Sequence, residues 1–267
     1  MKKLLLLLLF ILPSIAHADI TTGLVGWWKF DEATSGTCSG TTPDSSGQGN
    51  TGTCTNSPTY VAGKIGAGAM SFDGSTQYVD GGNITAFNSM AALTVSAWVK
   101  PSALANLQVM VSKFSTVDAK GWAIETSTTG IGGSNSTALI CGLQNNGADA
   151  YGYTANGVLA NNTWVHIVEV FDGSQSGNAR LKCYINGASR SLTYAGTIPA
   201  QTDNDTDAFR IGNSASNNRY FPGIIDDARV YNRALSAADV AQLYAYTGSV
   251  GNVIIRNAMI RNARLGY

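Results

Sequence analysis

The sequence predicts an all-β protein, an antiparallel sandwich or jelly roll that ends in one short helix. Short segments of alternating apolar and polar residues recur along the chain, and the clearest covers residues 93–101. Turn-forming pairs such as Asp73-Gly74 and Asn186-Gly187 separate several of these segments. Hydrophobic residues make up 44% of the chain, which is enough to fill a core. Many short strands at near-regular spacing favour two packed sheets.

The predicted strands follow one another with turn residues between them. In the first strand, Leu24, Gly26 and Trp28 alternate with Val25 and Trp27. A single all-β domain of this length is ordinary, so we expect one domain over residues 19–248. The later strands are expected at 70–82 (two strands around a turn), 93–101, 121–127, 138–147, 163–173, 179–187, 209–213 and from residue 223.

The short helix is expected directly after the last strand. Ser236 is a good N-cap, and Asp239 lies where an acidic side chain can complete a capping box. Val240 and Tyr244 recur at helical spacing. We therefore expect a short C-terminal helix that covers one end of the sandwich.

Residues 1–18 have the features of a secretory signal peptide. Lys2 and Lys3 precede an unbroken apolar run over residues 4–12, and small residues at Ala16 and Ala18 favour cleavage after Ala18. The run is shorter than the ~20 residues that a membrane-spanning helix needs. We expect an exported protein without a membrane span, located outside the cell, on its surface or in a periplasm.

The charge of the mature chain argues against a nucleic-acid partner. Without Lys2 and Lys3, the 17 basic residues become 15 against 17 acidic ones, a net charge of −2. Nucleic-acid binding needs a basic stripe. Residues 249–267 differ from the rest, because Ile-Arg-Asn-Ala occurs there twice and no acid does. This arginine-containing tail is either a strand that pairs with the body or with another subunit, giving an oligomer, or a frayed terminus.

All four cysteines follow the predicted cleavage site. An even number in an exported chain indicates two disulfides, for which three pairings exist. We favour Cys38–Cys54, which closes a loop rich in Gly, Ser and Thr, and Cys141–Cys183, which joins two later strands. A zinc site is disfavoured because the sequence has no Cys-x-x-Cys pair.

Seven motifs occur in order along residues 23–247. They are GLVGWWKFDE, PDSSGQGNTGT, GAMSFDGSTQYVDGG, LTVSAWVKP, NTWVHIVEVFDG, LKCYINGA and GIIDDARVYNRALSAADVAQLY. Together they resemble the laminin-G-like jelly-roll domains of the concanavalin A-like lectin/glucanase superfamily. The resemblance implies a two-sheet antiparallel jelly-roll sandwich with one concave sheet. It also implies calcium, which many members carry, and the binding of glycans or proteins.

Two adjacent aspartates interrupt the apolar alternation of residues 223–236. A period of two puts Asp226 on the face of Ala228 and Val230, and Asp227 on the opposite face with Arg229. A buried carboxylate needs a cation or several N–H donors. Calcium, backbone N–H groups and an arginine are therefore the alternatives for Asp226.

The resemblance also suggests where calcium would lie. Related domains commonly hold it where the first strand, the following Gly-rich loop and the last strand converge. Calcium accepts carboxylate, amide and backbone carbonyl oxygens. Carried over to this chain, the expected ligands of a structural calcium ion are Asp31, Asp44, Asn50 and Asp226 or Asp227.

Residues for catalysis are scarce. His166 is the only histidine after the cleavage site and lies mid-strand, where a structural role is favoured. Glycoside hydrolysis needs two facing carboxylates, and the Glu-x-Asp-x-x-Glu strand motif of the superfamily's glucanases is absent. Glu169 and Asp172 would point to opposite faces of a strand because they are three residues apart. We therefore expect no enzymatic activity.

Several aromatic residues lie in or beside polar segments rich in Gly and Asn. Sugar rings stack on aromatic faces, and nearby amides orient their hydroxyl groups. The best binding loop is expected within residues 145–157. The predicted ligand-binding residues are Trp122, Tyr151, Tyr153 and Tyr220. The tryptophans in strand patterns are expected in the core: Trp28, Trp98 and Trp164.

These expectations combine into one functional hypothesis. The chain is predicted to be an exported, disulfide-bonded sandwich with structural calcium that binds a glycan or a glycosylated surface. The first alternative is a structural or adhesive subunit that docks other proteins through its C-terminal tail or a sheet edge. A glycoside hydrolase is the third and least favoured hypothesis.

Overall fold

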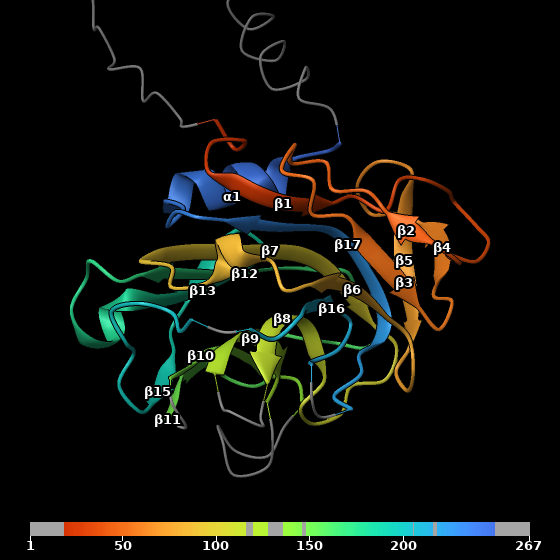
Figure 1. The fold of residues 1–267 in the computed structure, drawn as a ribbon. Coiled ribbons are helices and arrows are strands. Elements are labelled where there is room, and N and C mark those ends of the chain that lie inside the picture. The colour runs from red at the N-terminus through yellow and green to blue at the C-terminus, as the bar shows by residue number, and fades with distance from the viewer. Residues whose placement is uncertain are drawn as a thin grey trace, which may run out of the picture.

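Two antiparallel β-sheets stack face to face in this protein (Figure 1). The computed structural model describes residues 19–115, 120–127, 136–145, 148–204, 206–215 and 218–248. One α-helix of this part, α1 (Ala237–Ala245), lies on the outer face of the first sheet (Figure 1). The architecture confirms the predicted jelly-roll sandwich with a short C-terminal helix.

The first sheet has eight strands and carries the helix. Its central strands β12, β7 and β17 are long and almost fully buried, because the core covers one face and a second apolar layer covers much of the other. In order across the sheet the strands are β14 (Ala188–Arg190), β13 (Leu181–Ile185), β12 (Val165–Asp172), β7 (Ala92–Pro101), β17 (Pro222–Tyr231), β5 (Gly68–Asp73) and β4 (Thr59–Ala62), with β1 (Leu24–Trp28) paired to β17.

The second sheet has nine strands and forms the opposite layer. From β8 to β11, strands that follow one another in the sequence also pair with one another in the sheet, as expected for hairpin connections. In order they are β15 (Thr193–Ala195), β11 (Ala148–Tyr153), β10 (Leu139–Asn145), β9 (Lys120–Thr126), β8 (Val109–Ser115), β16 (Phe209–Ile211), β6 (Tyr78–Gly82), β3 (Gly52–Thr55) and β2 (Thr41–Thr42). Two short 3-10 turns, η1 (Thr85–Phe87) and η2 (Gly177–Arg180), lie in the connections.

Aromatic rings fill the core between the sheets. Trp28 and Phe209 stack with ring centroids 4.6 Å apart, and Phe87 meets Phe209 edge-on at 5.3 Å. Trp122 is 1% exposed and tilts against the same two phenylalanines at 6.1 Å. The core position predicted for Trp28 is confirmed. The prediction that Trp122 binds a ligand is wrong, because the alternation of β9 points its ring inward.

A second apolar layer lies between the first sheet and α1. Trp98 and Tyr231 are buried there against Val240 and Leu243 of the helix. The Ser236 hydroxyl accepts from the backbone N–H of Asp239, and the Asp239 carboxylate accepts from the N–H of Ser236, at 3.1 and 3.0 Å. The predicted capping box is confirmed. The helix therefore begins where the chain, having left β17, turns back over the outer face of the first sheet.

A β-bulge changes the facing of residues in β17. Asp226 lies opposite Trp98 of β7, and Arg229 lies opposite Ser96. Between these pairs β17 has two residues, Asp227 and Ala228, where β7 has only one. Asp227 has φ 52°, a left-handed conformation that Asp tolerates better than most residues. The prediction that Asp226 and Asp227 point to opposite faces is wrong. Both carboxylates lie on the helix side of the sheet.

The bulge also explains which residues of β17 enter the core. Ile225, Ala228 and Val230 belong to the cluster between the sheets. Without the extra residue, Ala228 and Val230 would share a face with Asp226, as the sequence pattern predicted. Because of the inserted residue, the side chains of Ala228 and Val230 point into the core, while the Asp226 carboxylate stays outside it.

The cysteines form one disulfide in the described residues. Cys38 and Cys54 are bonded, as predicted. Cys141 and Cys183 are free, buried thiols, so the second predicted disulfide is wrong for this structure. They lie on β10 and β13 in opposite sheets and meet across the core through a hydrogen bond. Burial raises the pKa of Cys141 and disfavours the thiolate from which a disulfide forms.

Candidate functional site

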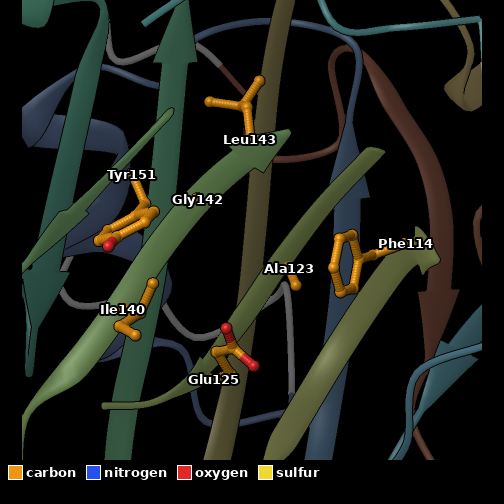
Figure 2. A pocket seen from close by; sticks show the side chains of 7 residues that line it. All are labelled: Phe114, Ala123, Glu125, Ile140, Gly142, Leu143 and Tyr151. Carbon is orange, nitrogen blue, oxygen red and sulfur yellow. The ribbon is translucent and has the colours of Figure 1, made fainter. Parts of the chain in front are cut away.

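A pocket lies on the outer face of the second sheet, above strands β8 to β11 (Figure 2). Successive residues of a strand point to opposite faces, so the neighbours of the core residues Ile124 and Cys141 face outward. The pocket has an empty volume of about 280 Å³, its open mouth included. Its lining residues are Phe114, Ala123, Glu125, Ile140, Gly142, Leu143 and Tyr151.

Strand register creates the floor of this pocket. Gly142 lies opposite Ala123 on one side and opposite Tyr151 on the other, and Ser112 lies opposite Ala123 on β8. These short side chains leave a depression that runs across the strands. A Cβ atom at Gly142 would lie 2.9 Å from the Cβ atom of Tyr151. Because Gly142 has no side chain, the side chain of Tyr151 can lie directly against the floor of the pocket.

Two tyrosines border the pocket on β11. The rings of Tyr151 and Tyr153 are both partly exposed and lie 6.5 Å apart with a 45° tilt. The sequence pattern placed them in a loop, whereas the structure places them on a strand whose alternation points both outward. Tyr153 lies opposite Ile140. Together these three side chains present an apolar surface that can face the C–H groups of a sugar ring.

A charged pair lies at the other side of the pocket. Arg219 donates to Glu125 at 2.7 Å, and its guanidinium lies 5.6 Å from the ring of Phe114. The side chains of the pair are 19% and 12% exposed. A half-buried arginine of this kind retains N–H donors beyond those that face the carboxylate. The pocket thus combines an aromatic side with a polar side.

The remaining predicted aromatic residue lies in the loop before β17, beside strand β6 of the second sheet. Tyr220 is 6.3 Å from Tyr78 of β6, and Arg210 stacks on Tyr78 at 4.5 Å. Arg210 also pairs with Asp80 at 3.1 Å. Tyr220 is partly exposed but does not line the pocket that contains Tyr151. Its assignment as a ligand-binding residue remains a prediction.

Asp44 and Asn50, two of the predicted calcium ligands, fasten the loop after β1. Asp44 accepts backbone N–H groups from Trp27, Ser46 and Asn50 at 2.8–2.9 Å. The side-chain amide of Asn50 donates to the carbonyl of Val25 at 2.7 Å. Both residues already have partners that explain their positions. They hold the loop against the first strand and are not gathered with Asp226 in the described structure.

Asp31 and Asp226 are brought together by the loop that precedes β5. Asp226 Oδ2 accepts the N–H groups of Lys64 and Ile65 at 2.7 and 2.8 Å, and Asp31 Oδ1 accepts those of Ala67 and Gly68 at 2.6 and 2.9 Å. The backbone hydrogen bonds considered for Asp226 therefore exist. Asp226 Oδ1, however, is buried and has no hydrogen-bond partner.

The environment of Asp226 favours its neutral form when no cation is present. Burial raises its pKa to about 8, and the neighbouring carboxylates of Asp227 and Asp31 act in the same direction. A proton or a cation would each relieve this buried charge. In the described part of the chain, no group of three His, Cys, Asp or Glu side chains is arranged to hold a metal ion.

Asp227 has a structural partner. It pairs with Arg229 at 3.0 Å and accepts from the indole N–H of Trp27. The Arg229 guanidinium lies between the rings of Trp27 and Tyr246, 4.3 and 4.4 Å from their centroids. Burial opposes the charge of Arg229, but the Asp227 carboxylate outweighs it and raises the arginine's pKa. This predicted calcium ligand therefore forms a buried ion pair.

The two buried titratable groups of β12 do not reach the pocket. His166 contacts the hydroxyl of Ser96 through Nε2 at 3.0 Å, and burial lowers its pKa to about 3. Glu169 accepts from the N–H of Gly142 at 3.2 Å, and burial raises its pKa well above the usual range. Both are held neutral inside the protein. His166 is buried in the protein interior, which agrees with the structural role predicted from its mid-strand position. Its Nδ1 atom has no hydrogen-bond partner.

The sequence pattern missed most of the pocket. Phe114, Ile140 and Ala123 looked like ordinary strand residues, and Arg219 lies far along the chain from Glu125. Alternation could have shown that Ile140 faces away from Cys141, but not that its exposed neighbours form a depression. That required the pairing of β9, β10 and β11.

Two predicted segments lie at the chain termini. The predicted signal peptide over residues 1–18 and the arginine-containing tail over residues 249–267 lie outside the described residues. Within the described residues, no helix has both the length and the apolar character needed to cross a membrane.

The stacked sheets and the outer pocket define a jelly-roll domain. The family model of the concanavalin A-like lectin/glucanases superfamily matches residues 73–241, and the chain belongs to this family. The resemblance inferred from the seven motifs is confirmed. A comparison with curated protein sequences finds no match.

Solved structures with the same fold include several binding domains. Domain 4 of AbnA, an extracellular GH43 arabinanase from Geobacillus stearothermophilus solved with arabinotriose, has 22% identity and a TM-score of 0.59 over 83% of this chain and 98% of that domain. The binding domain of Paraclostridial Mosquitocidal Protein 1 has 15% identity and a TM-score of 0.58. The match covers 85% of this chain and 52% of that one.

The receptor-binding domain of botulinum neurotoxin type G is similar to the same degree. Its identity is 15% and its TM-score 0.57, over 84% of this chain and 51% of that one. The chain spans about half the length of both toxin domains. At these identities the likeness establishes the fold.

Proposed function

We propose that this chain is an exported, non-catalytic protein that binds a glycan in the outer pocket of β8–β11. The observation that carries the proposal is the arrangement of that pocket. A floor of Ala123 and Gly142 lies between partly exposed tyrosines on β11 and the Glu125–Arg219 pair. Sugars need such a combination, because their rings have apolar faces and polar edges.

The chemistry of the pocket favours binding over hydrolysis. Hydrolysis of a glycosidic bond needs two carboxyl groups, one on each side of the bond. Glu125 is the one acidic side chain among the lining residues of the described structure, and it is paired with Arg219. The likeness to a domain solved with arabinotriose supports the same assignment.

We further propose a structural calcium ion beside Asp226. The buried Oδ1 atom of Asp226 has no donor, and Asp31, which accepts N–H groups from the same loop before β5, lies close enough to raise the Asp226 pKa. Calcium is a hard cation that would accept both carboxylates together with carbonyl or water oxygens. Asp44, Asn50 and Asp227 have other partners and are left out of this smaller set.

A glycan array with wild-type protein and a Tyr151→Ala variant tests the binding proposal. We expect wild type to bind a subset of glycans and the variant to lose about fivefold or more in affinity, since an aromatic stacking contact is worth about 1 kcal/mol or more. Tyr244→Ala is the matched control, because Tyr244 is an exposed tyrosine on the helix side of the protein. Equal glycan binding by wild type and Tyr151→Ala would contradict the assignment of this pocket.

A further inference from the structure

A second groove opens where the two sheets are connected at one edge of the sandwich. Residues 154–158, which follow β11, form one side, and the β13–β14 hairpin forms the other. The empty volume is about 920 Å³, the mouth included, so the groove is large enough for several sugar units. It shares no lining residue with the pocket above β8–β11.

Arg190 is the charged residue of this groove, and it has no ion pair or side-chain hydrogen bond in the described structure. The other arginines of the described residues are held in place. Carboxylates pair with Arg210, Arg219, Arg229 and Arg233, and backbone carbonyls accept from Arg180. Arg190 is also exposed, so its guanidinium N–H groups are available to a ligand.

The rest of the groove supplies donors and no acid. The Oδ1 atom of Asn186 accepts the backbone N–H of His166 at 2.9 Å, which fixes the orientation of the amide. The NH₂ group of the same amide therefore points away from the His166 backbone and can donate to a ligand. Ser191 adds a hydroxyl group, and no Asp or Glu lies among the lining residues. Such a set favours an anionic group over a neutral one.

Apolar residues complete the groove. Ile185 is 2% exposed and Val158 is half-buried, and both line the groove beside Asn156 and Gly157. The exposed part of Val158 can face the C–H groups of a sugar, while the planar fork of Arg190 can donate to a carboxylate in a bidentate manner. A free inorganic anion would use the arginine and leave the apolar part uncovered.

We propose that this groove is a second binding site, specific for a sugar that carries a carboxylate, such as a uronic acid unit of an acidic glycan. Arg190 binds the carboxylate, and Asn186 and Ser191 donate to the same group or to adjacent hydroxyls. The site is separate from the pocket above β8–β11. Its ligand is acidic, whereas the ion pair in that pocket leaves no unpaired charge among its lining residues.

Titration of the full chain with an oligogalacturonate of four units tests the proposal, with a neutral galactan oligomer of equal length as the comparison. Isothermal titration calorimetry gives the affinity, and backbone amide shifts in NMR spectra give the location. We expect the acidic oligomer to shift the amides of Asn156, Gly157 and Ser191. Arg190→Gln should weaken its binding about tenfold or more, since a hydrogen bond to a charged group is lost.

Lys182→Gln is the matched control. Lys182 is an exposed cation on neighbouring β13 that does not line the groove, so its substitution removes the same net charge. Equal weakening by Lys182→Gln, unchanged binding by Arg190→Gln, or no binding of the acidic oligomer would each overturn the proposal. Tyr151→Ala keeps the two sites distinguishable, because it should leave acidic binding in the groove intact whether or not the outer pocket binds glycans.

Discussion

Asp226 places one buried oxygen where no N–H or O–H group reaches it. The other oxygen of the carboxylate accepts two backbone N–H groups from the loop before β5. An uncompensated buried charge is costly, so the site must take up a proton or a cation. Which of the two it takes decides how the stability of the protein responds to pH.

The first prediction concerns the pH dependence of stability without calcium. Burial raises the Asp226 pKa from 3.8 to about 8, so the folded protein keeps a proton that the unfolded chain releases. The resulting stabilisation is complete below about pH 4 and is lost as the pH rises to about 8, by up to about 1.4 kcal/mol per pH unit. Asp226→Asn should flatten this part of the profile in denaturant unfolding with a chelator present.

Calcium should change the wild-type profile. The ion binds the ionised carboxylate, so calcium should stabilise wild type most at neutral pH and above, and should have little effect on Asp226→Asn. The same unfolding series with calcium in place of chelator measures this. Identical wild-type stability in calcium and in chelator at pH 8 would show that no calcium site depends on Asp226.

At the scale of elements, β17 and α1 form one continuous unit. The bulge at Asp227 turns both aspartates toward the helix side, and the capping box at Ser236 then begins α1 over the same face. Arg233 contributes by pairing with Asp239 at 3.0 Å. The helix is only nine residues long, so its stability depends on this cap and on packing rather than on its own propensity.

The second prediction concerns the helix cap. Ser236→Ala removes the acceptor for the N–H of Asp239 and should lower the free energy of unfolding by about 1 kcal/mol. For a chain of this size that corresponds to a melting temperature about 2–4 °C lower. Ser176→Ala is a suitable control, because Ser176 precedes η2 without making a side-chain capping bond. Equal shifts for both variants in thermal unfolding would refute the role of the cap.

At the scale of the whole molecule, an apolar core holds the two sheets together, and no disulfide of the described residues joins a strand of one sheet to a strand of the other. The disulfide Cys38–Cys54 joins parts of the N-terminal region, and the two thiols that meet across the core are not bonded. Their environment includes the neutral carboxyl of Glu169. Cohesion between the layers therefore depends on buried side chains such as Trp28, Phe209 and Phe171.

The third prediction uses a reducing agent to count the disulfides. Opening the loop closed by Cys38 and Cys54, which are separated by 16 positions, should cost about 3 kcal/mol. Reductant should therefore destabilise wild type by about this amount in equilibrium unfolding. A Cys38→Ala/Cys54→Ala variant should unfold identically with and without reductant. A remaining effect in that variant would mean that Cys141 and Cys183 are bonded in solution.

Local patterns in the sequence were sufficient for the class of fold, the helix and one disulfide. Strand alternation, turn pairs and the Ser236–Asp239 spacing act over a few residues, and the bond between Cys38 and Cys54 closes a short loop. Aromatic residues in a Gly- and Asn-rich segment also pointed to Tyr151 and Tyr153, although the segment was expected to be a loop and forms strand β11.

The tertiary structure decided what depends on partners far along the chain. The bulge at Asp227 moved the side chains that follow it in β17, such as Ala228 and Val230, to the opposite face of the strand. A pattern of strict alternation in the sequence cannot predict such a bulge. Trp122 lies in the core because the packing of the two sheets covers its face of β9, and the pairing of β9 to β11 assembled the pocket floor from Ala123 and Gly142. Facing follows from local geometry, but a binding site forms only where separate strands bring their faces together.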